Sequence, residues 1–255
     1  MAIHSFRPYF LLVGLFALWV SAWGLLYPVE VGRALPWTVP PLHARFIAAM
    51  YLAGALAMAW SWFEHRRMAA VRIPLALASL WTGALMLVSL LHLPEFDFSK
   101  PQVWFWMGAY VAYPLWGAWL YFRGGAASAA RTRRSDPALV AVAAGCLVLA
   151  LALLIAPATM VRAWPWTISP LLANIYAGPF FAYGVCALML AREAQPEARR
   201  IVLASMLSFA LVALLASLLH IKLFHFDAPA AWVWFSAFAA AVGVLAWRLA
   251  QGREP

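Results

Sequence analysis

The tetrapeptide Ser-Leu-Leu-His occurs at residues 89–92 and again at residues 217–220, and each copy begins the same aromatic pattern. The first copy is followed by Phe96, Phe98, Pro101, Trp104 and Trp106, and the second by Phe224, Phe226, Pro229, Trp232 and Trp234. Each position of the second copy lies 128 residues after its counterpart, as 217 − 89 shows. This spacing predicts a tandem duplication.

A second pattern recurs at nearly the same spacing. Pro-Trp-Thr occupies residues 36–38 and residues 165–167, which are 129 positions apart, and a Pro-Leu pair follows each copy at residues 41–42 and 170–171. We therefore divide the chain into a first repeat at residues 1–123, a basic linker at residues 124–136 and a second repeat at residues 137–255.

The composition is that of a membrane protein. Hydrophobic residues make up 66% of the chain and charged residues only 11%, whereas soluble domains contain about 25% charged residues. Apolar runs long enough to cross a bilayer recur along the chain. They predict an all-α polytopic protein with eight transmembrane helices near residues 9–27, 42–63, 73–91, 101–122, 137–155, 170–191, 201–219 and 229–249. Four spans per repeat give both repeats the same orientation, with a pseudo-twofold axis along the membrane normal.

The basic residues predict the orientation of these spans. Five of the 18 lie on the side opposite the N-terminus, namely Arg33, Arg45, Lys100, Arg162 and Lys222, and the other 13 lie on the N-terminal side. Basic residues concentrate in cytoplasmic loops, so we expect both termini in the cytoplasm. The net charge of +9 is then a topology signal, and nucleic-acid binding is not expected. The abundance of Ala and Arg over Lys is typical of GC-rich bacterial genomes and favours a plasma (inner) membrane location.

Two histidines, His92 and His220, end equivalent spans on the predicted outer side. One interpretation is that each imidazole faces the last carbonyls of its own helix. The other is that the two rings meet across the axis and bind a transition metal or haem. Together with Asp97, His225 and Asp227 they form a nitrogen and oxygen set suited to zinc or iron, although no compact ligand motif such as HExxH is present.

The remaining candidates surround the Pro-Trp-Thr copies. Trp37 and Trp166 suit the aromatic belt at a membrane interface, as do the four tryptophans that follow the two SLLH copies. An aromatic cage around a flat apolar ligand is the alternative. His43 and Arg45 lie in the first turn of a span, where Arg45 either extends to the interface or binds a carboxylate or phosphate. Asn174 is the counterpart of Arg45.

Missing patterns narrow the function. No acid or lysine lies near a predicted bilayer midplane, which argues against an ion-driven carrier. No G-x-S-x-G motif supports a serine hydrolase. We expect an integral membrane binding module, or a membrane subunit of a larger complex, with an outward-facing pocket for a small or lipid-like ligand. A membrane metalloenzyme or haem protein using His92 and His220 is the second hypothesis, and an uncoupled transporter is the third. Whether the protein is an enzyme stays open, and the bilayer and other membrane subunits are the expected partners.

Overall fold

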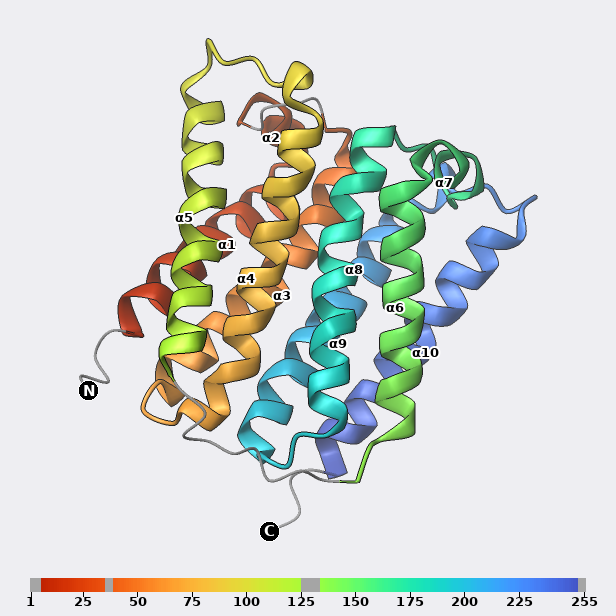
Figure 1. Cartoon of the computed structure of the whole chain (residues 1–255). Coiled ribbons are helices and arrows are strands. Elements are labelled where there is room, and N and C mark those ends of the chain that lie inside the picture. The colour runs from red at the N-terminus through yellow and green to blue at the C-terminus, as the bar shows by residue number, and fades with distance from the viewer. Residues whose placement is uncertain (1–5, 35–38, 125–133, 252–255) are drawn as a thin grey trace.

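The computed structural model describes residues 6–34, 39–124 and 134–251, and within these ranges it contains ten α-helices and no strand (Figure 1). Eight helices are long: α1 (Arg7–Leu26), α3 (Pro41–Glu64), α4 (Met68–Leu91), α5 (Pro101–Arg123), α6 (Pro137–Ile155), α8 (Pro170–Ala191), α9 (Pro196–Leu219) and α10 (Pro229–Gln251). Two short helices, α2 (Pro28–Ala34) and α7 (Pro157–Ala163), follow α1 and α6. Short 3-10 turns, η2 (Leu93–Glu95) and η3 (Ile221–Leu223), follow α4 and α9. The sequence did not predict these four short elements.

Proline marks most helix starts. Nine of the ten α-helices carry proline in their first turn, where its missing N–H costs no hydrogen bond. The exception is α4. Both α4 and α9 begin five residues before the predicted spans (73 − 68 and 201 − 196). Their first two turns contain arginines, such as Arg72 and Arg199, so each helix begins before its apolar run.

Seven of the long helices are apolar and long enough to cross a membrane. The eighth long helix, α5, has 23 residues but carries four tryptophans and three tyrosines, which reduce its mean hydropathy. Large apolar side chains are exposed along the outer helices, for example Val148 on α6 and Trp247 on α10. The protein is therefore a helical membrane protein that contacts lipid, with seven candidate spans where the sequence predicts eight.

Four helices form the centre of the bundle. Helix α3 packs against α9, α4 packs against both α8 and α9, and the remaining long helices lie outside them (Figure 1). Helix α1 covers α3, α6 covers α8, α5 covers α4 and α10 covers α9. The outer helix of each of these four pairs lies in the same half of the chain as its partner. We call residues 6–124 the first half and residues 134–251 the second half.

Hydrogen bonds recur at the spacing of the sequence repeat. The indole N–H of Trp106 donates to the Ser89 hydroxyl at 2.9 Å, and that of Trp234 donates to the Ser217 hydroxyl at 3.0 Å. The Trp104 indole donates to the Phe98 carbonyl at 2.9 Å, and its counterpart Trp232 donates to the Phe226 carbonyl at 3.1 Å. The repeated residues thus make the same local contacts in both halves.

These contacts correct the aromatic-belt interpretation. Trp104 and Trp232 are exposed and suit an interface, but Trp106, Trp234 and Trp166 are buried. The prediction was wrong for these three because their rings pack inside the bundle. Trp37 lies outside the described residues.

Candidate functional site

The end of the bundle that carries α2 and α7 contains two matching hydrogen bonds between the halves, besides a bond from His43 to Tyr176. Arg45 Nη1 on α3 lies 2.6 Å from Nε2 of His220, which follows α9. His92 Nε2, after α4, lies 2.7 Å from Oδ1 of Asn174 on α8. Arg45 and Asn174 are repeat counterparts, and so are the two histidines. The two hydrogen bonds are therefore counterparts. In one the histidine belongs to the second half, and in the other it belongs to the first half.

The Arg45 contact fixes the proton state of His220. A guanidinium can only donate hydrogen bonds, so His220 Nε2 must accept and the ring is neutral. Burial and, to a smaller extent, the charge of Arg45 lower the pKa of His220 below its usual range.

His92 has the opposite requirement. The amide Nδ2 of Asn174 donates to the carbonyls of Leu153 (2.7 Å) and Leu154 (3.2 Å), so the amide oxygen faces His92 as an acceptor. The other ring nitrogen, Nδ1, lies 2.8 Å from the Glu95 carboxylate, a second acceptor. His92 therefore faces two acceptors, whereas the equivalent His220 faces a cationic donor.

His43 and Trp166 lie in packed surroundings. His43 Nδ1 is 2.6 Å from the buried Tyr176 hydroxyl, and the two rings stack with their centroids 6.2 Å apart. Trp166 is 1% exposed and lies edge-on to Trp234 at 4.8 Å. Side chains of the protein occupy the space around both predicted ligand residues. No sequence pattern indicated a role for Tyr176, whose counterpart is Ile47.

The proposed metal ligands do not gather. In residues 6–34, 39–124 and 134–251, no three His, Cys, Asp or Glu side chains lie together as a metal site. Asp97 is exposed, and hydrogen bonds from Ser99, helped by Lys100, lower its pKa. His225 and Asp227 are exposed as well. His92 and His220 contact side chains of the opposite half, so neither sequence interpretation describes these contacts.

A cavity opens inside the second half. It has a volume of about 390 Å³ and is lined by α6, α8, α9 and α10; we call it the α10 cavity. Its lining is apolar except at its ends and includes Cys146, Phe180, Phe238 and Ala241. A Cβ added at Gly145 on α6 would meet no atom within 4 Å. Gly145 lies between the lining residues Val142 and Cys146 and is exposed, so the α6 surface beside this cavity has room for additional atoms.

The first half contains the corresponding cavity almost filled. It is lined by α1, α3, α4 and α5, has a volume of only about 40 Å³, and is called here the α5 cavity. The rings of Phe16 and Tyr113 contact each other with their centroids 5.8 Å apart. Their counterparts in the second half are Gly145 and Ala241. Beside them, the hydroxyl groups of Tyr51 and Tyr110 form a hydrogen bond. The counterparts of these tyrosines in the second half are Phe180 and Phe238. Aromatic side chains therefore fill in one half the space that stays open in the other.

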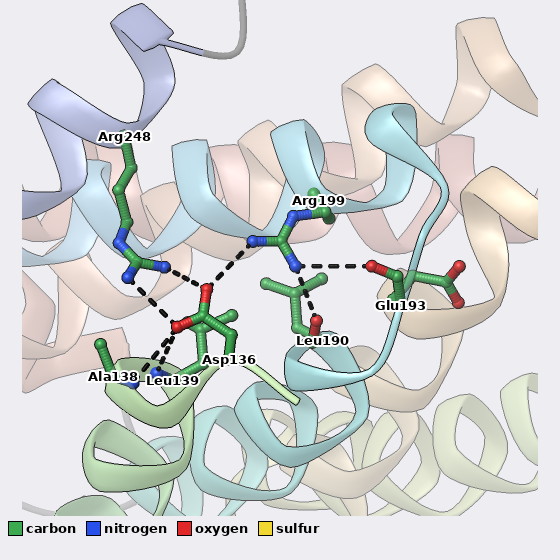
Figure 2. Close-up of polar contacts among 7 residues, drawn as sticks. All are labelled: Asp136, Ala138, Leu139, Leu190, Glu193, Arg199 and Arg248. Carbon is green, nitrogen blue, oxygen red and sulfur yellow. Dashed lines mark hydrogen bonds and ion pairs between the residues drawn. The ribbon is translucent and has the colours of Figure 1, made fainter. Parts of the chain in front are cut away.

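A charged cluster lies at the α6 start, at one end of the α10 cavity (Figure 2). Arg248, which lines the cavity, donates from Nη1 and Nη2 to the two oxygens of Asp136 at 2.6 and 3.2 Å. Arg199 donates to the same carboxylate at 3.4 Å. Asp136 also caps α6 by accepting from the Ala138 and Leu139 N–H groups. The hydrogen bonds from Arg248 are the main cause that lowers the pKa of Asp136 to about 2, so the carboxylate is ionised.

Sequence reasoning missed both the α10 cavity and this cluster. The available signal was the loss of bulk in the second repeat, from Phe16 to Gly145 and from Tyr113 to Ala241. Comparisons with protein-family models, curated proteins and solved structures found no match.

Proposed function

We propose that the protein is an integral membrane binding module that holds an apolar, lipid-like molecule in the α10 cavity. The observation that supports this is the difference between two equivalent spaces, about 390 Å³ for the α10 cavity against about 40 Å³ for the α5 cavity. Ligand pockets commonly have volumes of about 300–1,000 Å³. The open volume therefore suits a ligand.

The surroundings favour a lipid chain as the occupant. The cavity lies between helices that are themselves candidate spans, so hydrocarbon rather than water is the neighbouring solvent. Binding inside a bilayer gains little from the hydrophobic effect and depends on close packing. A flexible chain that restores the contacts missing along this wall fits that requirement.

The polar end of the bundle takes a structural role in this proposal. The sequence predicted an outward-facing pocket centred on His92 and His220, with His43, Arg45, Asp97, His225 and Asp227 around it. In the structure Arg45 and Asn174 bond to the histidines at the ends of α9 and α4, and His43 bonds to Tyr176. These contacts link the halves, so we assign ligand binding to the cavity inside the second half.

We also propose that the two halves are tandem repeats of four spans each, related by a pseudo-twofold axis along the membrane normal. The support is the recurrence of the Trp–Ser bonds within the halves and of the His contacts between them. The excess of arginines at the α6 start side supports cytoplasmic termini. A bacterial plasma membrane and association with other membrane subunits remain proposals from composition.

Filling the cavity tests the function. Ala241→Tyr places in α10 the side chain that its counterpart Tyr113 has in α5, and Gly145→Phe does the same for Phe16. Either variant should lose lipid that remains bound to the wild-type protein after detergent exchange, as measured by native mass spectrometry. Val233→Tyr is the matched control because Val233 is 64% exposed and does not line the cavity.

The reverse variant extends the test to the first half. Tyr113→Ala enlarges the α5 cavity and should add a bound lipid. Equal lipid retention by wild type, Ala241→Tyr and Gly145→Phe would refute the proposed function.

A further inference from the structure

One end of the α10 cavity carries a charge. Among the described residues that line this cavity, one is charged, Arg248. The other lining residues are apolar apart from the Tyr183 hydroxyl and the Cys146 thiol. In the first half the position of Arg248 is occupied by Leu120, which is buried. The open cavity and the arginine therefore occur together, in the same half.

Arg248 keeps donors that Asp136 does not use. Arg248 and Arg199 both donate to the Asp136 carboxylate. Glu193 contacts Arg199 through its backbone carbonyl, while its carboxylate points away and accepts from the Gln195 N–H (Figure 2). A guanidinium has five N–H donors, of which Asp136 accepts two from Arg248. The cluster can thus accept a further anion.

The apolar part of the cavity extends away from this charge. Along α10 the lining runs from Arg248 to Ala237, which are 11 residues apart (248 − 237). At about 1.5 Å per residue this is roughly 16 Å. An elongated apolar space that ends at an arginine matches the shape of an amphiphile.

We propose that the ligand of the α10 cavity is a bilayer amphiphile with an anionic head group, a carboxylate or a phosphate. Its head contacts Arg248 at the end of α10, and its chain lies along α10 toward Ala237. This inference rests on the proposed function, because it adds a head-group site to the same cavity. Arginine is suited to this role because its planar donors bind carboxylate and phosphate oxygens in pairs.

The experiment uses two photoreactive probes that share one chain. One is a hexadecanoic acid with a mid-chain diazirine, and the other is its primary amide, which has no charge. The full-length protein in nanodiscs of a neutral lipid is irradiated with each probe at a pH at which the acid is ionised, and labelling of α6 and α10 peptides is measured by mass spectrometry. The acid should label about tenfold more than the amide, since a charge-assisted hydrogen bond is worth on the order of a decade in affinity.

Three variants of the cluster separate the contributions. Arg248→Gln should reduce acid labelling to the level of the amide, whereas Arg248→Lys keeps the charge and should retain part of the preference. Asp136→Asn removes the competing carboxylate while Asn remains a good helix N-cap, so acid labelling should rise and amide labelling should not. The opposite responses of Arg248→Gln and Asp136→Asn are not expected from a merely structural ion pair.

The outcomes distinguish this inference from the proposed function. Equal labelling by acid and amide in wild type, unchanged in Arg248→Gln, would overturn the head-group site and leave the cavity as a chain site. Labelling by both probes that persists in Ala241→Tyr would overturn the proposed function itself. Preference for the acid that is lost in Arg248→Gln and raised in Asp136→Asn supports the inference.

Discussion

The two halves share a frame and differ inside it. In both, a tryptophan near the start of the last helix donates to a serine near the end of the helix before it, Trp106 to Ser89 and Trp234 to Ser217. The interiors differ because Phe16 and Tyr113 fill the α5 cavity, while their counterparts Gly145 and Ala241 leave the α10 cavity open.

This difference shows which positions can differ between the halves at little cost. The Trp–Ser hydrogen bonds join the side chains of two packed helices, so their loss disturbs the frame. An interior side chain that shrinks in a bilayer leaves space that a lipid chain can fill, so the loss of packing is partly restored. We infer that the α5 cavity retains a packed, structural role and that the α10 cavity has become the binding space.

The largest expected effect concerns the shared frame. Trp106→Ala and Trp234→Ala should each lower the free energy of unfolding by about 3 kcal/mol, because each removes a buried ring and leaves a buried serine without its donor. Unfolding in SDS–detergent mixtures, followed by circular dichroism, measures both losses on one scale.

Exposed tryptophans provide the control for this pair. Trp104→Ala and Trp232→Ala remove rings that are 64% and 61% exposed, so each should cost much less. A loss at Trp106 several times that at Trp234 would show that the two halves do not depend on the same contact.

The sequence predicted the frame better than the site. Apolar runs and prolines located all eight long helices, because both are local signals. Pairing of His92 with Asn174 was not predictable, since it joins residues 82 positions apart. The α10 cavity was missed because Gly145 and Ala241 are ordinary residues in an apolar helix, and only their filled counterparts reveal the open space.

A smaller effect is expected from the links between the halves. Asn174→Ala removes the acceptor for His92 and leaves the carbonyl of Leu153 without its donor, which should cost about 1–3 kcal/mol. A double-mutant cycle of His92→Ala with Asn174→Ala should give a coupling energy of about 0.6 kcal/mol or more.

The cross pair His92→Ala with Arg45→Ala serves as the reference for that cycle. Arg45 bonds to the other histidine, so these two substitutions should be additive. Coupling of equal size in both cycles would mean that the four residues act as one cluster, and the assignment of two separate links would be wrong.

The smallest effect separates the two histidines by pH. Burial and Arg45 lower the pKa of His220 below 6.5, so the unfolded chain binds a proton at a pH where folded His220 does not. Stability from this site is then complete above pH 6.5 and decreases as the pH falls toward the lowered pKa. Because the pair is partly exposed, the loss should be less than about 1 kcal/mol.

The measurement is the free energy of unfolding at pH 7.5 and pH 5.5, for wild type, His220→Gln and His92→Gln. His220→Gln should reduce the loss of stability on acidification, because glutamine accepts from Arg45 at either pH. His92→Gln is the control, because His92 contacts Glu95 and Asn174 rather than Arg45. If both substitutions reduced the loss equally, the Arg45 contact of His220 would not be its cause. The assignment of the pH effect to His220 would then fail at the position where the halves are most alike in sequence.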